Sequence, residues 1–305
     1  MTLKRNVLIF HLGALGDFII TWPLALTLAR LYPQSRVFYV THGQKGALAE
    51  RILRVESYDV EGGWHRLFSE EAELPAPAAK ALAGAHTLVS FLADPDGRWA
   101  ANCRQANPGV SLLNLCTTMP EGFVGHVTEF LNEQLSAWPA AQTAAVQILR
   151  SINERGLLAI PNSTGPVVIH PGSGAARKNW PPEKFAQLCE RLRKDGRDAR
   201  VILGEVELEQ WPPALIAQLE SSAQVLRPKN LLELHDHISA AKVFVGNDSG
   251  PTHLAGILGI PTVAIFGPTS NPVRWKPLGP RVRIVSGELN ELPVDAVYTA
   301  SRLGE

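Results

Sequence analysis

One stretch of the chain, residues 243–267, reads V-F-V-G-N-D-S-G-P-T-H-L-A-G-I-L-G-I-P-T-V-A-I-F-G and decides the fold class. Its apolar start, residues 243–245, is β-branched and aromatic and predicts a strand covered on both faces. A turn-forming cluster follows at residues 247–250, and Pro251 can open a helix because a first-turn N–H has no intrahelical partner. A second strand is predicted at residues 262–266. This order of elements is typical of an α/β protein with a parallel sheet.

The helix predicted at residues 251–258 would direct its free N–H groups and the positive end of its dipole toward a ligand. Ser249 or Gly250 is the expected N-cap. His253 lies in the first turn, where a hydrogen bond or an imidazolium charge can reach a diphosphate. Asp248 would repel phosphate, so we expect it to bind a sugar hydroxyl or to brace the backbone. The turn therefore predicts a phosphate site.

Length and composition indicate two domains and exclude several classes of protein. A chain of 305 residues with 45% hydrophobic content can bury two cores. The 29 basic and 29 acidic residues give no bulk charge for binding nucleic acid. No apolar run approaches the roughly 20 residues that span a bilayer, and the N-terminus does not resemble a signal peptide, so we expect a soluble, cytoplasmic protein. The three cysteines form no C-x-x-C pair, which disfavours a disulfide framework and a zinc site.

Strand-like runs alternate with helical stretches along the whole chain, which is the rhythm of a parallel sheet. A break rich in proline, glycine and serine, residues 160–166, separates two such series. We therefore predict two α/β domains with parallel sheets, residues 1–160 and 161–305, with a last helix at about 288–305. The predicted strands are residues 7–10, 37–40, 87–92, 110–113, 167–170, 200–203, 243–245, 262–266 and 282–285.

The loop after the first predicted strand contains Gly13 and Gly16, which allow a tight turn and a close approach to a ligand. A dinucleotide site would need G-x-G-x-x-G and an acidic residue at the end of the second strand, and the chain offers only G-x-x-G followed later by T-H-G. A nicotinamide enzyme is therefore disfavoured. Asp17 opens the next helix, where a carboxylate is favourable against the dipole, and spacing alone favours that structural role.

Two later loops carry charge that suits a nucleoside diphosphate. Arg177 and Lys178 follow the strand that His170 closes, and a departing diphosphate needs such positive charge. Glu205 and Glu207 follow the next strand, where each can also be an ordinary acid at a helix start.

Three ordered segments resemble glycosyltransferase family 9, the ADP-heptose:lipopolysaccharide heptosyltransferases. They are H-L-G-A-L-G-D-F-I-I-T-W-P-L at residues 11–24, I-H-P-G-S-G-A-A-R-K-N-W-P at residues 169–181, and D-S-G-P-T-H with the following G-I-P-T-V-A-I-F-G-P-T at residues 248–269. The resemblance implies the GT-B fold, two facing Rossmann-like domains with parallel sheets. In that fold the first domain binds the acceptor and the second the nucleotide sugar, and the C-terminal helix often packs back on the first domain.

The resemblance also implies an inverting glycosyl transfer that needs no metal or other cofactor. Asp17 would be the catalytic base that takes a proton from the acceptor hydroxyl, with Gly13 and Gly16 in the acceptor-side loop. Lys178 would stabilise the departing diphosphate together with the helix start at residues 248–253. Ser173 would hydrogen-bond phosphate oxygens, and Glu207, chosen over Glu205, would contact the ribose.

The implied donor is ADP-heptose, and the implied acceptor is a lipid-linked glycan such as the lipopolysaccharide inner core. We expect a monomer with peripheral contact at the inner face of the cytoplasmic membrane. The alternatives are a GT-B sugar-nucleotide epimerase or hydrolase and a catalytically silent nucleotide-sugar-binding protein. His11 stands where the family usually has arginine or lysine, which weakens the case for a positive charge beside Asp17. The candidates for contact with an anionic acceptor are Lys45, Arg51, Arg54, Arg66, Arg98 and Arg104, although most are expected to be solvated residues.

Overall fold

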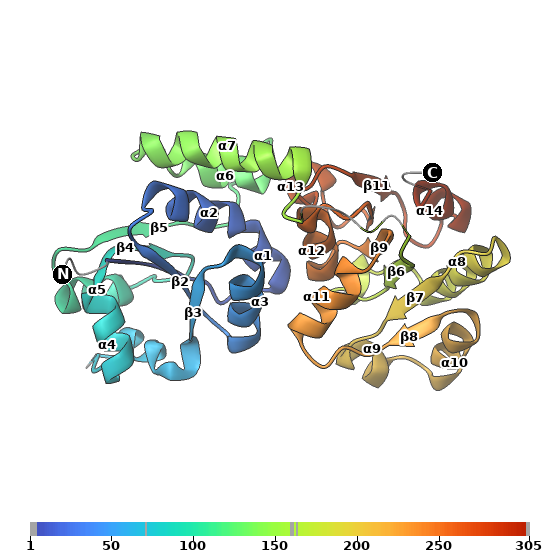
Figure 1. Cartoon of the computed structure of the whole chain (residues 1–305), viewed down its shortest axis with the longest axis horizontal. Coiled ribbons are helices and arrows are strands. Elements are labelled where there is room, and N and C mark those ends of the chain that lie inside the picture. Colours follow the sequence, from blue (N-terminus) through green and yellow to red (C-terminus); the bar gives the residue numbers. More distant parts are fainter. Residues whose placement is uncertain (1–4, 71, 159–161, 163, 303–305) are drawn as a thin grey trace. The chain divides into compact units, whose positions relative to one another are not determined.

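The computed structural model describes residues 5–70, 72–158, 162 and 164–302. It divides into two compact units, Met1–Phe123 with Val127–Leu149, and Val124–His126 with Arg150–Glu305. Each unit is an α/β domain built on one parallel sheet (Figure 1). The division falls within helix α7, and the domain boundary predicted at residues 160 and 161 lies outside the described residues.

The first unit has a five-stranded sheet in the order β3-β2-β1-β4-β5, with every pair of strands parallel. Strands β1 and β4 mark the place where the direction of winding reverses, so the loops after them flank the crevice where such sheets bind ligands. The helices and strands of this part of the chain are β1 (Asn6–Phe10), α1 (Leu15–Ile20), α2 (Trp22–Leu31), β2 (Arg36–Thr41), α3 (Gly43–Leu53), β3 (Glu56–Asp59), α4 (Ala76–Ala83), β4 (Ala85–Ser90), α5 (Arg98–Ala106), β5 (Ser111–Asn114), α6 (Val127–Glu133) and α7 (Pro139–Arg155), with 3-10 helices at Val60–Gly62 and Trp64–Phe68.

The second unit has a six-stranded parallel sheet in the order β11-β10-β9-β6-β7-β8. Its reversal point lies between β6 and β9, because the chain winds outward from β6 on one side and from β9 on the other. Its elements are β6 (Val167–His170), the 3-10 helix η3 (Ala176–Lys178), α8 (Pro182–Lys194), β7 (Ala199–Ile202), α9 (Glu205–Gln210), α10 (Pro213–Ser222), β8 (Gln224–Leu226), α11 (Leu231–Ser239), β9 (Val243–Asn247), α12 (Gly250–Leu258), β10 (Thr262–Phe266), α13 (Pro272–Trp275), β11 (Val282–Ser286) and α14 (Val294–Ala300).

A large core lies between the sheet of the second unit and helices α8, α10 and α14. Alternate residues of β9, Val243 and Val245, point into it and pack with Phe185 and Leu188 of α8. Val297 of α14 belongs to the same core and is fully buried. The contacts of α14 described here are therefore to its own unit, and its expected packing against the first domain stays a prediction.

Each predicted strand is present to within two residues at either end. Two further strands, β3 and β8, were not predicted, and both lie at the edges of their sheets. Pro23 explains the break between α1 and α2, because a proline removes a backbone donor inside a helix and is tolerated near a helix start. The chain ends α1 at Ile20, turns at Thr21 and begins α2 at Trp22, with Pro23 at the second helical position.

Candidate functional site

Two loops of the second unit meet at the carboxyl ends of β6 and β9. The β6 loop runs from Pro171 to Trp180 and includes η3, and the β9 loop is Asp248 and Ser249 before α12 begins at Gly250. Because β6 and β9 are paired in parallel, their following loops lie at one edge of the sheet. This edge, at the reversal point, is where an open α/β sheet binds its ligand.

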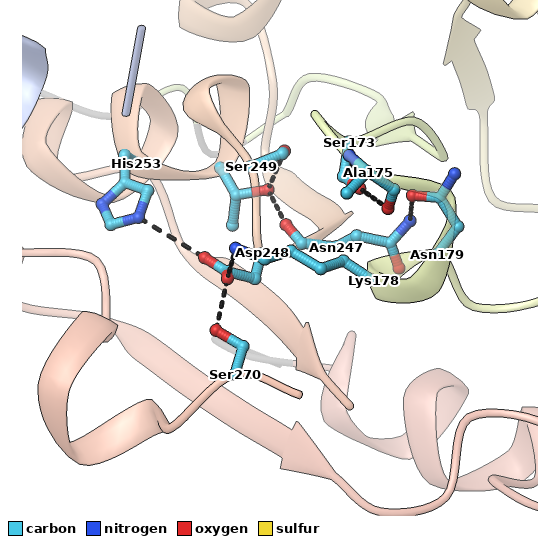
Figure 2. A network of polar contacts seen from close by, with 10 residues as sticks. Ser173, Ala175, Lys178, Asn179, Asn247, Asp248, Ser249, His253 and Ser270 are labelled. Carbon is cyan, nitrogen blue, oxygen red and sulfur yellow. Dashed lines mark hydrogen bonds and ion pairs between the residues drawn. The ribbon is translucent and has the colours of Figure 1, made fainter. Parts of the chain in front are cut away.

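The central feature of this edge is the Asp248 carboxylate, on which three other side chains converge (Figure 2). Lys178 of η3 donates to Oδ2 with an Nζ to Oδ2 distance of 2.7 Å, and Ser270 donates to the same oxygen at 2.5 Å. His253 of α12 places Nε2 at 3.7 Å from Oδ1. Asp248 and His253 are buried, and the Lys178 side chain is 30% exposed. The site thus holds an ammonium group at a defined position and leaves it accessible to a ligand.

The surroundings of Asp248 keep it ionised. Burial raises the pKa of a carboxyl, but the neighbouring His253, Lys178 and Ser270 groups outweigh that effect and hold the pKa of Asp248 below its usual range. The carboxylate therefore positions the Lys178 cation at neutral pH and offsets part of its charge. A role toward a sugar hydroxyl or the backbone stays a prediction.

The Asn247 side chain fixes the β6 loop through backbone atoms. Its Oδ1 accepts from the Trp180 backbone N–H at 3.0 Å, and its Nδ2 donates to the Pro171 carbonyl at 2.6 Å. Asn247 is fully buried, and its own carbonyl accepts from the Thr252 hydroxyl at 2.6 Å. A buried amide that makes these bonds holds both ends of the β6 loop at the end of β9.

Glu207 also lies beside the β6 loop, near Gly172. Its Oε2 accepts from the Gly204 backbone N–H at 2.8 Å at the start of α9, and a Cβ on Gly172 would lie only 1.8 Å from its Oε1. Glu207 is buried, whereas Glu205 is exposed. Burial lowers the pKa of the adjacent His170, and the charge of Glu207 partly opposes that shift. Of the two acids, Glu207 is the one that contacts the β6 loop.

A pocket of about 400 Å³ lies beside Ser270. It is lined by the residues that follow β10 and β11, including Gly267, Asn271 and Glu288. Ser270 both lines this pocket and donates to Asp248, so it also belongs to the group of Lys178, Asp248, His253 and Ser270, which we call the Asp248 cluster.

In the first unit, Asp17 follows the loop after β1 and lies near the Lys45 ammonium group. Asp17 lies in the first turn of α1, is half-buried, and interacts electrostatically with Lys45 of α3. The buried His11 packs its ring against Phe18 and Phe91 at centroid distances of 5.4 and 5.6 Å. Burial, and to a lesser degree the Lys45 charge, lower the pKa of His11 to about 3, so His11 is neutral at physiological pH.

Comparison with known proteins assigns the chain to a family. The model of glycosyltransferase family 9 (heptosyltransferase) matches residues 129–299, more than half of the chain. The chain belongs to glycosyltransferase family 9. The match covers every element of the second unit from β6 to β11 and so includes the whole Asp248 cluster.

Relatives within family 9 share part of the sequence. The chain is 33% identical to lipopolysaccharide heptosyltransferase 1 of Campylobacter coli over 108 residues, 34% of this chain and 32% of that protein. It is 29% identical to lipopolysaccharide heptosyltransferase 2 of Escherichia coli K12 over 156 residues, 48% of this chain and 43% of that protein. The chain thus spans less than half the length of these relatives.

Solved structures of the family share the fold. The structural match to E. coli ADP-heptose lipopolysaccharide heptosyltransferase II covers 97% of this chain and 97% of that one, with a TM-score of 0.71 and 19% identity. The E. coli heptosyltransferase WaaC with ADP covers 97% of this chain and 98% of that one, with a TM-score of 0.69 and 17% identity. The predicted GT-B fold class is therefore confirmed. Within the described residues, no helix has the length and apolar character to cross a membrane, and no three metal-binding side chains are grouped together.

The structure brings together most of the family 9 residues predicted in the second half of the chain. Lys178, Asp248 and His253 are in contact, and Ser249 and Gly250 begin α12 as expected. Ser173 lies in the β6 loop, but its hydroxyl bonds to the Ala175 backbone at 2.9 and 3.3 Å. Asp17, Gly13 and Gly16 lie in the first unit. Their catalytic and binding roles stay predictions.

Sequence reasoning missed two residues of the site and misjudged a third. Ser270 follows β10, the strand beside β9, and that position at the same sheet edge was the available signal. Asn247 was taken only as a turn residue, although it closes β9 and holds the β6 loop. Lys45 was one of six candidates for contact with the acceptor, most of them expected to be solvated, but the residue is only 9% exposed.

We expect Asp248→Asn to destabilise the second unit by about 2 kcal/mol at neutral pH, because it removes the counter-charge of a partly exposed Lys178. The pKa of Asp248 is lower in the folded than in the unfolded protein, where it is about 3.9. Its stabilisation is therefore complete above a pH of about 4 and is lost as the pH falls further toward the folded pKa. The difference in unfolding free energy between the wild type and Asp248→Asn is measured from the urea dependence of hydrogen exchange in β9 and β10, at a pH of about 7 and at a pH of about 3. A difference that does not shrink at the lower pH would contradict the assignment.

Proposed function

We propose that the chain is an inverting glycosyltransferase that moves a heptosyl group from ADP-heptose to a lipopolysaccharide core or related glycan. The observation that carries this proposal is the Lys178 ammonium group, held by Asp248 at the reversal point of the sheet. A cation there, beside the start of a nine-residue helix, can bind a diphosphate and stabilise the charge it gains on departure.

The reaction breaks the bond between the anomeric carbon and the oxygen of the β-phosphate. The electron pair stays with that oxygen, which becomes part of ADP, and Lys178 together with the N–H groups at the start of α12 stabilises the new charge. The acceptor hydroxyl oxygen forms the new bond from the opposite face of the sugar, and its proton passes to the Asp17 carboxylate. The configuration at the anomeric carbon is thereby inverted, and no metal or other cofactor takes part.

The second unit binds the donor in this proposal. Glu207 contacts the ribose hydroxyls, Ser173 turns its hydroxyl to a phosphate oxygen, and the pocket beside Ser270 takes part of the sugar. The burial of Glu207 against the β6 loop and the 400 Å³ volume of the pocket support these roles. The first unit binds the lipid-linked acceptor, and the protein works as a monomer in the cytoplasm, at the inner face of the membrane.

The test is release of ADP from ADP-heptose by the purified full chain, with and without a lipid A acceptor that carries Kdo sugars. Release that needs the acceptor, with the heptosylated product seen by mass spectrometry, supports the transferase. Release of nucleotide without acceptor would instead indicate a hydrolase or epimerase. ADP-heptose that binds without turnover on any acceptor would indicate a silent binding protein.

Gly172→Ala is expected to weaken ADP binding about tenfold, because the new Cβ displaces the Glu207 carboxylate. In the proposed function this carboxylate makes a hydrogen bond to the ribose worth about 1.5 kcal/mol. The Cβ would lie 1.8 Å from Oε1 of Glu207. Gly174→Ala is the matched control in the same loop, since a Cβ there meets no atom within 4 Å. Calorimetric titration with ADP measures both variants. Equal affinity in Gly172→Ala and Gly174→Ala would remove Glu207 from the donor site.

A further inference from the structure

Lys45 is a buried lysine that forms hydrogen bonds with the loop that precedes Asp17. The residue is 9% exposed, and its Nζ donates to the backbone carbonyl of Gly13 at 2.6 Å and approaches that of Leu12 at 3.4 Å. Both carbonyls belong to the turn between β1 and α1. The ammonium also lies 5.9 Å from the centroid of the Phe18 ring, which follows Asp17 in the chain.

The position of Lys45 is unfavourable in two ways. It is the third residue of α3, in the first turn, where the helix dipole favours negative charge and disfavours a cation. Burial also disfavours the ammonium and lowers the pKa of Lys45, although the charge of Asp17 opposes that shift. An apolar side chain of similar length would fill this space without either cost. A charge kept here needs a compensating role.

The contacts of Lys45 indicate what that role is. Its donor hydrogen bonds tie α3 to the β1–α1 turn, and its charge acts on Asp17. His11 follows β1 and begins the same turn. It supplies no charge at neutral pH, and its buried Nδ1 has no hydrogen-bond partner among the described residues. Lys45 therefore provides the positive charge near Asp17 that His11 lacks.

We propose that Lys45 is a positioning residue for Asp17: by binding the carbonyls of the β1–α1 turn it sets the place of the Asp17 carboxylate for proton transfer. The inference rests on the proposed role of Asp17 as base. Lys45 touches neither donor nor acceptor in this scheme, so its loss lowers kcat and leaves the donor KM unchanged. The effect follows from geometry, since a shift of about 1 Å in a catalytic group can cost about 100-fold in rate.

The test compares Lys45→Met and Lys45→Arg with Lys80→Met, an exposed lysine of α4 in the same unit. We expect kcat of Lys45→Met to fall about 100-fold, with the donor KM and the ADP affinity unchanged. Lys45→Arg keeps both a donor and a charge and should retain most of the rate. Hydrogen exchange of the α1 amides should accelerate in Lys45→Met and stay unchanged in Lys80→Met.

Two results would overturn the proposal. One is a kcat of Lys45→Met equal to that of the wild type. The other is an equal loss of rate in Lys45→Met and Lys45→Arg together with exchange that accelerates across the whole first unit, which indicates a folding role alone. If the wild type transfers sugar from no donor, the proposed function fails instead. Hydrogen exchange then decides the positioning role, and unchanged exchange of α1 in Lys45→Met would overturn it.

Discussion

Lys178→Met is expected to transfer sugar about 1,000-fold more slowly than the wild type, because the departing diphosphate loses the cation that stabilises it in the transition state. Methionine keeps the length and the packing of the side chain. The measurement is kcat for acceptor-dependent release of ADP. Lys194→Met is the control, since Lys194 is an exposed lysine in the last turn of α8 of the same unit.

The loss of Lys178 also leaves the buried Asp248 carboxylate without its ammonium partner, so part of the effect can come from instability. The double variant Lys178→Met with Asp248→Asn separates the two causes. It removes both charges and should recover stability relative to Lys178→Met, while its kcat stays low. A double variant that regains the wild-type rate would show that Lys178 does not stabilise the leaving group.

Asp17→Asn is expected to lower kcat by about 1,000-fold, because asparagine cannot accept the proton of the acceptor hydroxyl. The change is isosteric, so the helix start at α1 and the packing around Phe18 should be kept. Binding of ADP should be unchanged, since the proposed donor site lies in the second unit. Calorimetry with ADP and the rate of heptosyl transfer measure the two effects separately.

Asp96→Asn is the control for Asp17→Asn, because Asp96 is an exposed carboxylate in a turn of the same unit. It should transfer sugar at the wild-type rate. A moderate loss in Asp17→Asn, about tenfold or less, would mean that the acceptor hydroxyl loses its proton to another group. The carboxylate would then have only the structural role that its helix position favours.

The sequence predicted the central strands because they are buried on both faces and therefore read as continuous apolar runs. The edge strands β3 and β8 escaped prediction for the opposite reason. Strand β3 is the short and polar run E-S-Y-D, and β8 has only three residues. One neighbour is enough to pair an edge strand, so its side chains need not be uniformly apolar.

The meeting of Lys178 and Asp248 could be anticipated, because each follows a strand and parallel strands bring their carboxyl ends to one edge. Ser270 could not be assigned to Asp248 in the same way, since a serine in a turn has many local partners. Lys45 illustrates the general difficulty. Lysine is almost always exposed, and only the fold shows that the first turn of α3 faces the carbonyls of another loop.

The two hydrogen bonds from Asn247 to the β6 loop have a consequence for engineering the proposed donor site. Asn247 recognises the β6 loop through the Trp180 N–H and the Pro171 carbonyl, which are present whatever side chains the intervening residues carry. The middle of the loop, residues 173–177, can therefore be exchanged for other sequences of equal length while both of its ends stay in place. If the loop binds the donor as proposed, a library confined to these five positions samples new preferences for nucleotide sugars on an unchanged scaffold.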